Sequence, residues 1–217
     1  MNIAIDGPAG AGKSTIAKKT AKELGYIYVD TGAMYRGIAL YLLENDIDIS
    51  DAGYVEKKIE PVIIEIKYES DMQQIYLNGN NVTSKLREEA VGNMASKSSA
   101  LPCVRAKLLD LQRQLAKDYD VVMDGRDIGT NILPDAEVKV YLTASSKVRA
   151  RRRYDEIIAK GETADINVIE ADIITRDKQD MERETAPLRQ AEDAVYIDSS
   201  DMTIDEVVAT IIRLTKK

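Results

Sequence analysis

The 217-residue sequence contains no histidine, no tryptophan and no phenylalanine, and Cys103 is its single cysteine. Without histidine there is no imidazole general base, no Ser-His-Asp triad and no His-ligated metal. One cysteine excludes an intrachain disulfide, which suits a reducing compartment. No stretch approaches the roughly 18 consecutive apolar residues of a membrane-spanning helix. Any chemistry must therefore rest on Lys, Arg, Asp, Ser and backbone dipoles.

Charge and apolar content narrow the class of protein further. The formal net charge is -7, and a globally acidic protein is a poor partner for long nucleic acids. Hydrophobic residues make up 44% of the chain, enough for a folded core. The first apolar run breaks at Asp6, too early for a signal peptide, so we expect a cytoplasmic protein.

Short apolar runs alternate with amphipathic stretches along the chain. The patterns predict strands at 3–5, 26–29, 62–68, 74–77, 121–123, 138–142 and 195–197. They predict helices at 13–24, 32–43, 54–60, 88–99, 102–117, 146–160, 168–185 and 204–214. This alternation is typical of an α/β fold, with a central parallel sheet of about five strands and helices on both faces. The segment 62–82 predicts a small antiparallel insert.

The stretch from Gly7 to Ser14 matches the pattern G-x-x-x-x-G-K-[ST] in full, between a predicted strand and a predicted helix. Its glycines let successive backbone N–H groups point at phosphate oxygens, and the helix N-terminus adds a favourable dipole. Lys13 is expected to bridge the β- and γ-phosphates, and the Ser14 hydroxyl to reach Mg²⁺. The motif predicts binding of ATP or GTP without specifying the reaction.

Two further segments follow predicted strands and place polar groups at the same sheet edge. The first runs from Asp30 to Arg36, and its arginine suits a phosphate. The second is Asp124-Gly125-Arg126-Asp127, whose first aspartate suits a position near Mg²⁺. The alternatives are a surface arginine on an ordinary helix and a glycine-centred turn with a local ion pair.

A cluster of basic residues opens the helix predicted at 146–160: Lys147, Arg149, Arg151, Arg152 and Arg153. Like charges four residues apart repel, and cations are unfavourable near a helix N-terminus. A bound triphosphate would relieve both penalties. The alternative is a solvated basic face paired with Asp155 and Glu156.

These segments together resemble the bacterial cytidylate kinases, a family of P-loop nucleoside monophosphate kinases. The resemblance covers nearly the whole chain and rests on GPAGAGKST, DTGAMYR, ASKSSALPCVR, MDGRDIGT, PDAEVKVYLTASSKVRARRR and RDKQDMERETAPL. It implies one kinase domain over 1–217 with three parts. These are a core (about 1–30, 100–145 and 186–217), a monophosphate-binding lobe with the β insert (about 31–99), and a lid with the following helix (about 146–185).

The resemblance also implies roles for individual residues. ATP would be bound by Gly7, Pro8, Ala9, Gly10, Ala11, Gly12, Lys13, Ser14, Thr15 and Arg152. Catalytic roles would fall to Lys13, Arg36, Arg126, Arg149, Arg153 and Arg183. The acceptor would be bound by Thr31, Arg36, Ser96, Arg105, Asp124, Arg126, Asp127, Arg176, Asp180 and Arg183. Mg²⁺ would be held by Ser14, with Asp124 acting directly or through water.

Base chemistry favours cytosine over uracil. A carboxylate suits the N4 amino group of cytosine and an arginine suits its N3 and O2 acceptors, a pattern that Asp127, Ser96 and Arg105 supply. Uracil would present the wrong polarity, and a buried mismatch costs several kcal/mol. We therefore expect transfer of the γ-phosphoryl group of ATP to CMP or dCMP, with Mg²⁺ as cofactor.

Two other functions remain open at this point. One is a related small-molecule kinase acting on UMP, dephospho-coenzyme A or shikimate. The other is a GTP-dependent switch, although Thr175-Arg176-Asp177-Lys178 does not match the guanine-binding pattern N/T-K-x-D. The expected partners are small nucleotides, with no nucleic acid polymer, no membrane and no obligate protein partner, in a monomer.

Overall fold

The computed structural model describes residues 1–70 and 72–216, and its main sheet is parallel, with strand order β2-β6-β1-β7-β8. Each strand is short and apolar. Their bounds are β1 Asn2–Asp6, β2 Ile27–Asp30, β6 Val121–Gly125, β7 Val138–Thr143 and β8 Val195–Asp198. β1 is central, with Asp6 opposite Gly125 on β6 and Tyr141 on β7. β1 and β6 therefore end together beside Gly7, and β7 continues for two more residues, to Thr143.

The chain forms two compact units. The first comprises Met1–Tyr28 and the chain from Tyr119 onward, and the second is Val29–Asp118. The predicted division into core, acceptor lobe and lid stays a prediction.

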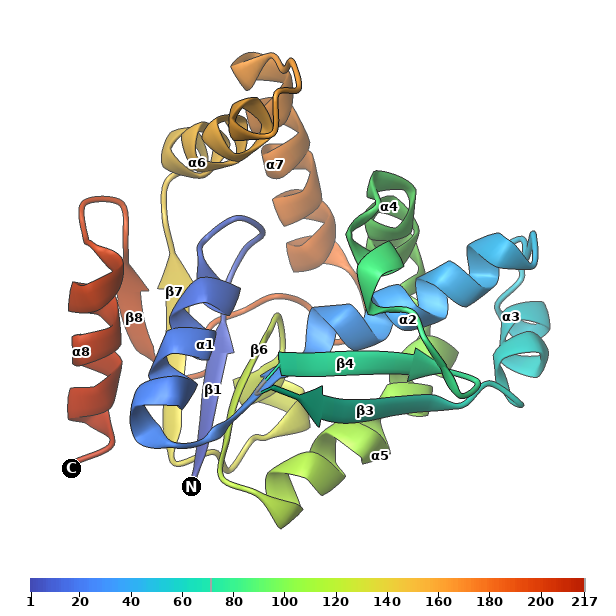
Figure 1. The fold of residues 1–217 in the computed structure, drawn as a ribbon, viewed down its shortest axis with the longest axis horizontal. Coiled ribbons are helices and arrows are strands. Elements are labelled where there is room, and N and C mark those ends of the chain that lie inside the picture. The colour runs from blue at the N-terminus through green and yellow to red at the C-terminus, as the bar shows by residue number, and fades with distance from the viewer. Residues whose placement is uncertain (71, 217) are drawn as a thin grey trace. The chain divides into compact units, whose positions relative to one another are not determined.

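In the first unit, helices α1 (Lys13–Leu24) and α8 (Ile204–Leu214) lie side by side over the sheet (Figure 1). Ile16 and Ala17 of α1 and Ile211 of α8 pack with Ile3 and Val140 of the sheet, all nearly inaccessible to solvent. Burial of this apolar surface holds the helices on the sheet. It thereby holds the start of α1 at the end of β1.

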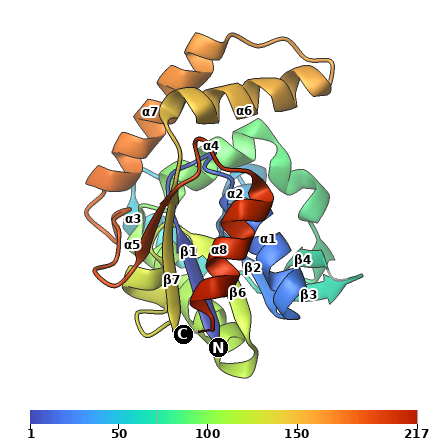
Figure 2. The ribbon, with the colours of Figure 1, turned by 90° about the vertical axis from the view of Figure 1, so that its left-hand side faces the viewer.

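Two further helices of this unit, α6 (Ser146–Ala159) and α7 (Ile166–Glu182), form a hairpin that follows β7 (Figure 2). The Ser145 hydroxyl caps α6 by accepting from the Val148 N–H at 3.3 Å, and Asp165 caps α7. Ser146 Oγ donates to Glu170 at 2.7 Å and joins the two helices.

The second unit contains α2 (Thr31–Glu44), α3 (Ala52–Ile59), α4 (Glu89–Ser98) and α5 (Pro102–Asp118). It also contains an antiparallel sheet of β3 (Ile64–Glu69), β4 (Met72–Leu77) and β5 (Asn80–Asn81), followed by a 3₁₀ turn at Thr83–Arg87. Its core includes Met34, Ile38 and Leu42 of α2, with Ile75 from the insert.

The predicted fold class is confirmed: a five-stranded parallel sheet flanked by helices, with a separate small antiparallel sheet. Sequence analysis did not predict the two-residue strand β5 or the π-helical turn at Ile128–Ile132. Helix α7 ends at Glu182, not at 185 as predicted, and Arg183 is already extended (φ -62°, ψ 139°). Its Nε and Nη2 both donate to the Ala186 carbonyl, which turns the chain before Pro187.

Candidate active site

The loop from Gly7 to Ser14 has a backbone that only glycine adopts without strain at three positions. Gly7, Gly10 and Gly12 have φ values of 151°, 72° and 86°. A Cβ on Gly7 would lie 1.9 Å from the Leu142 carbonyl oxygen, so no other residue fits there. Gly12 is the N-cap of α1, and the loop therefore opens directly into a helix N-terminus, where N–H groups attract anions.

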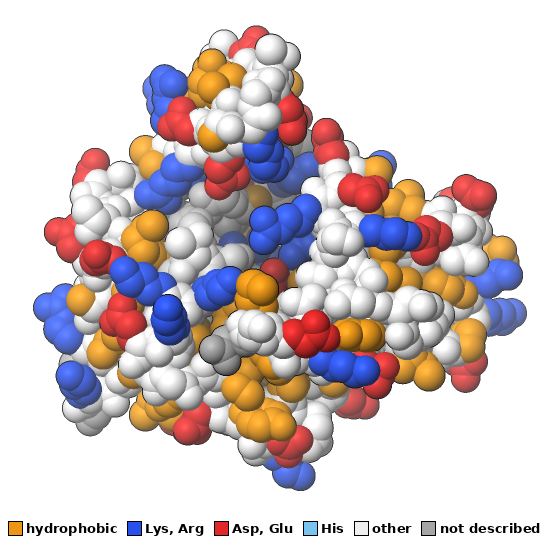
Figure 3. Space-filling model, in the orientation of Figure 1, with side chains coloured by type: hydrophobic (Ala, Val, Ile, Leu, Met, Phe, Trp, Pro, Cys, Tyr) orange, Lys and Arg blue, Asp and Glu red, His pale blue; other side chains and the backbone are white. Residues whose placement is uncertain are grey.

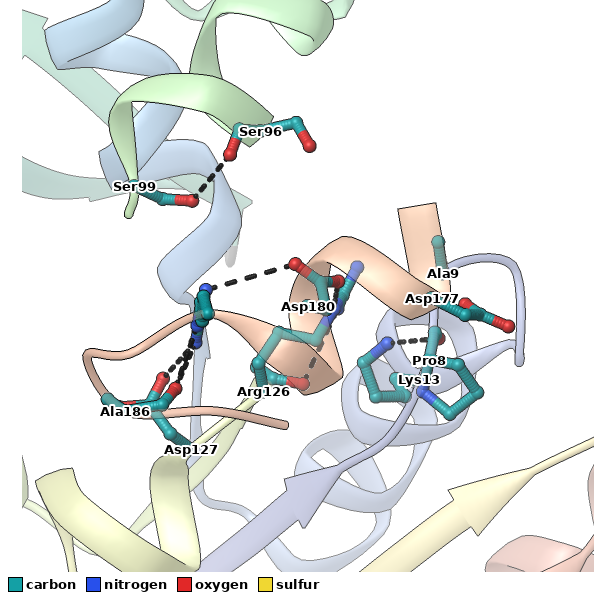
Figure 4. A network of polar contacts seen from close by, with 12 residues as sticks. Pro8, Ala9, Lys13, Ser96, Ser99, Arg126, Asp127, Asp177, Asp180 and Ala186 are labelled. Carbon is teal, nitrogen blue, oxygen red and sulfur yellow. Dashed lines mark hydrogen bonds and ion pairs between the residues drawn. The ribbon is translucent and has the colours of Figure 1, made fainter. Parts of the chain in front are cut away.

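Lys13 is buried at the base of this loop, and its Nζ donates to the Pro8 carbonyl at 2.8 Å (Figure 4). Burial, together with the positive charge of Arg126, lowers the pKa of Lys13 to about 7. A polyphosphate would reverse this effect, because a nearby negative charge favours the ammonium form. The side chain is therefore arranged to gain charge when an anion binds.

Ser14, Asp124 and Tyr28 form a connected group at the carboxyl ends of β1 and β6. Ser14 Oγ donates to Asp124 Oδ2 at 3.0 Å, and the Tyr28 hydroxyl donates to Asp124 Oδ1 at 2.9 Å. Asp124 is buried. A hydroxyl and a carboxylate are the hard oxygen ligands that Mg²⁺ prefers, so the predicted pair fits this ion.

Asp6 is a site residue that the sequence analysis missed. Its buried carboxylate accepts from the N–H groups of Ile128 and Gly129, each at 2.7 Å. Burial raises the pKa of Asp6 to about 6, although these two hydrogen bonds oppose the shift. Since Asp6 immediately precedes Gly7, it ties the beginning of the phosphate loop to the segment after Asp127. In the sequence, the feature that could have indicated Asp6 is a single carboxylate at the end of a predicted strand, directly before the phosphate loop.

Arg126 and Arg183 converge on one carboxylate of α7. Arg126 Nε donates to Asp180 Oδ2 at 2.7 Å, and Arg183 Nη1 lies 3.8 Å from Asp180 Oδ1 (Figure 4). Arg183 Nη2 also donates to Asp127 at 3.3 Å. The partner of Arg126 therefore lies on another element, unlike the local ion pair that sequence analysis left open.

Arg149 is buried among protein acceptors. Its Nε donates to Ala144 O at 2.8 Å and its Nη1 to Ala9 O at 2.9 Å. Asp177, which sequence analysis also missed, accepts from Nη1 at 3.1 Å and from Nη2 at 2.6 Å. These bonds use four of the five N–H donors of the guanidinium. Arg149 is thus held against the backbone of the phosphate loop.

The neighbouring basic residues have different surroundings. Arg153 is exposed and donates to Glu156 at 3.2 Å, one of the partners expected of a solvated face. Arg152 donates to the Ser199 carbonyl at 2.8 Å and reaches towards Ala11 O at 3.5 Å. Figure 3 shows Lys and Arg side chains on the side of α6 that faces the loop between β1 and α1.

Arg152 also lines a cavity of about 680 Å³ within the first unit. Its lining includes the polar residues Ser14 and Thr15 and the apolar residues Met202 and Val207. This volume is in the usual range of small-molecule sites. Lys13 and Arg152 in its lining suit the phosphates of a nucleotide and the apolar residues suit its base, while Asp155 and Glu156 also line the cavity.

In the second unit, Asp30 and Arg36 form an ion pair at the beginning of α2. Asp30 Oδ1 caps the helix by accepting from the Ala33 N–H at 2.8 Å, and Asp30 Oδ2 accepts from Arg36 Nη2 at 3.0 Å. Among the residues that the structure describes, no partner meets the buried Nε of Arg36. Thr31 is buried beside this pair. The side chain of Arg36 is 30% exposed, so an incoming phosphate could reach its guanidinium.

The other predicted acceptor-binding residues divide between the two units. In the second unit, Arg105 is buried, its guanidinium lies 5.5 Å from the centre of the Tyr35 ring, and Ser96 O accepts from Ser99 Oγ at 3.1 Å (Figure 4). In the first unit, Arg176 is half-buried on α7, the helix that carries Asp180. The contacts described for these residues therefore lie within one unit or the other.

Comparison with known proteins identifies the family. A model of the family described as cytidylate kinase matches residues 3–217. The chain belongs to the cytidylate kinase family. The resemblance drawn from the sequence, and with it the prediction of a kinase, is confirmed.

Relatives match over almost their whole length. The chain is 47% identical to the cytidylate kinase of Lactobacillus johnsonii over 217 residues, covering 100% of this chain and 94% of the relative. It is 48% identical to that of Caldicellulosiruptor saccharolyticus, covering 100% and 96%. A crystal structure of an uncharacterized protein from Eubacterium ventriosum shares the fold, with a TM-score of 0.54 at 14% identity over 100% of this chain and 99% of that one.

One structural finding bears on membranes. None of the helices in residues 1–70 and 72–216 has the length and apolar character needed to span a bilayer.

Proposed function

We propose that this member of the cytidylate kinase family transfers the γ-phosphoryl group of ATP to CMP or dCMP. An oxygen of the acceptor phosphate forms a bond to the γ-phosphorus while the bond from that phosphorus to the β,γ-bridging oxygen breaks, giving CDP or dCDP and ADP. The observation that carries the proposal is the occurrence of a complete phosphate loop and the Arg126–Asp180–Arg183 group in the same compact unit.

On the donor side, the backbone from Gly7 to Gly12, with Ser14 and Thr15, binds the phosphates, and Lys13 neutralises charge that develops on them. Arg152 and Arg153 approach from α6. Arg149 acts through the backbone: in a trans peptide the C=O and N–H point in opposite directions, so holding Ala9 O directs the Gly10 N–H away from Arg149. This orients the N–H as a phosphate donor.

Mg²⁺ accompanies ATP in this proposal. Ser14 and Asp124 would hold it, because their oxygens already lie 3.0 Å apart. Mg²⁺ is usually bound through one or two protein oxygens together with substrate phosphates and water, which this small ligand set suits. When bound, the ion spreads the negative charge of the β- and γ-phosphates.

On the acceptor side, Arg36, Arg126 and Arg183 would hold the acceptor phosphate, with Thr31 beside it. Ser96, Arg105 and Asp127 would bind the cytosine edge, and Arg176 and Asp180 the ribose. The attacking group is a phosphate oxygen that is already anionic at neutral pH. The reaction therefore requires in-line placement and exclusion of water, and no general base.

A coupled assay with purified protein, MgATP and CMP, dCMP, UMP or AMP tests the proposal. CMP and dCMP should be phosphorylated far faster than UMP and AMP, because uracil presents the wrong polarity to Asp127 and Arg105. Comparable rates with UMP and CMP would contradict the assignment of the base. Turnover of dephospho-coenzyme A without turnover of CMP would favour the alternative kinase. ATP hydrolysis that no acceptor stimulates would contradict both.

The proposal also covers the partners, the oligomeric state and the compartment of the protein. The partners are small nucleotides, and the protein acts as a monomer in the cytoplasm, where ATP and CMP are available. A sedimentation experiment checks the monomer, since a stable dimer would contradict it.

A further inference from the structure

Gln73 of β4 makes two hydrogen bonds with the backbone of Asp30, the residue that caps α2 and pairs with Arg36. The Asp30 N–H donates to Gln73 Oε1 at 2.8 Å, and Gln73 Nε2 donates to the Asp30 carbonyl at 3.0 Å. The side-chain amide therefore pairs with Asp30 as a neighbouring strand would. Gln73 and Asp30 are separated by 43 residues in the sequence, so this contact links the β insert to the beginning of α2.

Asp30, held in this way, is the residue that positions Arg36. Its carboxylate caps α2 through the Ala33 N–H and accepts from Arg36 Nη2 at 3.0 Å. Gly32 leaves room for the guanidinium, because a Cβ there would lie 3.0 Å from Arg36 Nη1. The orientation of the guanidinium thus depends on where the Asp30 backbone lies.

The insert is packed closely enough to transmit this constraint. A Cβ on Gly37, the residue after Arg36, would lie 3.1 Å from Ile64 Cδ1 and 3.2 Å from Ile75 Cγ2. These isoleucines belong to β3 and β4, and Ile75 is fully buried on the same face of β4 as Gln73. The insert sheet is therefore seated directly on the turn of α2 that carries Arg36.

We propose that Gln73 is a positioning residue for the acceptor phosphate, acting through Asp30 on Arg36. The β insert then has a specific role, because it fixes the guanidinium of Arg36, a side chain that is 30% exposed, in position for the phosphate. This inference rests on the proposed function, since it assigns Arg36 to the acceptor.

Substitution of Gln73 and of its neighbour Gln74 separates positioning from general effects on the strand. Gln74 points to the other face of β4, where its Oε1 accepts from Asn81 Nδ2 at 3.2 Å. Calorimetric Kd values for CMP and for ATP, with kcat, are measured for wild type, Gln73→Ala and Gln74→Ala. We expect Gln73→Ala to weaken CMP binding about tenfold and to lower kcat, with ATP binding changed less than about twofold. Gln74→Ala should resemble wild type in all three.

Melting temperatures show whether Gln73→Ala is folded. If it is not, Gln73→Glu tests the positioning role instead. Glutamate keeps the size and the Oε1 acceptor, but it cannot donate to the Asp30 carbonyl. It should weaken CMP binding and leave ATP binding as in wild type. Unchanged CMP affinity in both Gln73 variants, or equal losses for CMP and ATP, would overturn the inference. Wild type that does not phosphorylate CMP would instead refute the proposed function.

Discussion

The Ser14 hydroxyl, in the first turn of α1, and the Asp124 carboxylate, at the end of β6, are 110 residues apart in the sequence and lie 3.0 Å apart in the structure. Tyr28 orients the other carboxylate oxygen. These two hydrogen bonds hold a hydroxyl and a carboxylate oxygen side by side, an arrangement that suits Mg²⁺.

Asp124→Asn should weaken the use of Mg²⁺, since an amide oxygen carries no charge for the ion. We expect the Mg²⁺ concentration for half-maximal activity to rise about tenfold and kcat to fall. A Mg²⁺ titration at fixed ATP measures both. Asp135→Asn, an exposed carboxylate in the same unit, serves as the control. Equal Mg²⁺ requirements in the two variants would show that Asp124 does not contribute to Mg²⁺ binding.

ATP binding should take up a proton at pH 8. The pKa of Lys13 is lowered to about 7, so at pH 8 much of it is neutral, and the triphosphate will raise this pKa and draw in a proton. Calorimetric binding enthalpies in two buffers of different ionisation enthalpy give the number of protons, which we expect to be up to about one. Lys13→Arg, which stays charged, should show no uptake from this position. Buffer-independent enthalpies in wild type would contradict the prediction.

Asp6 should make the protein less stable as pH rises between about 4 and 6. Its pKa is raised from 3.8 to about 6, so in that window the folded protein keeps a proton that the unfolded chain has released. The contribution is therefore present below pH 4 and lost as pH passes 6, on the order of 3 kcal/mol for this group alone.

Denaturant unfolding of wild type and Asp6→Asn at several pH values isolates this contribution, because the other carboxylates are common to both proteins. The difference between their free energies of unfolding, wild type minus variant, should fall as pH rises through the window. A difference that is constant with pH would show that Asp6 does not titrate there.

Two glycine-to-alanine substitutions should have opposite effects on stability. Gly7→Ala places a Cβ 1.9 Å from the Leu142 carbonyl and should cost about 3 kcal/mol or more. Gly92→Ala lies in helix α4, where nothing is within 4 Å of the added Cβ, and should stabilise by about 0.5–1 kcal/mol. Melting temperatures check both signs. A Gly7→Ala protein as stable as wild type would mean that the loop has a different conformation.

Asp177→Asn should impair the donor side selectively. The substitution removes the charge that holds Arg149, and the Ala9–Gly10 peptide then loses its fixed orientation. We expect KM for ATP to rise about fivefold to tenfold, with KM for CMP little changed. Asp172→Asn, exposed on the same helix, is the matched control. If both variants show the same KM for ATP, Arg149 does not act through Asp177.

Local sequence was sufficient for most of the secondary structure and for the phosphate loop. Gly7, Gly10 and Gly12 are needed for the backbone of the loop itself, and short continuous apolar runs identify the strands of the main sheet whichever neighbours they acquire. The predicted end of α7 was wrong because Arg183 donates hydrogen bonds to the Ala186 carbonyl, a contact that helix propensity does not take into account.

Distant partners could not be predicted from local patterns. Asp6 meets the Ile128 N–H across 122 residues, and Arg149 meets Asp177 across 28. Such pairs depend on strand order and helix packing, which set distances that no sequence spacing encodes.

The sequence by itself determined the α/β class, the family and the residue types available for phosphate and base, because backbone conformation and side-chain chemistry are local properties. Only the tertiary structure decided which charges meet. Arg126 and Arg183 share Asp180, Arg149 is held by Asp177, and Gln73 holds Asp30, since burial leaves each polar group to be paired by whatever the fold brings beside it.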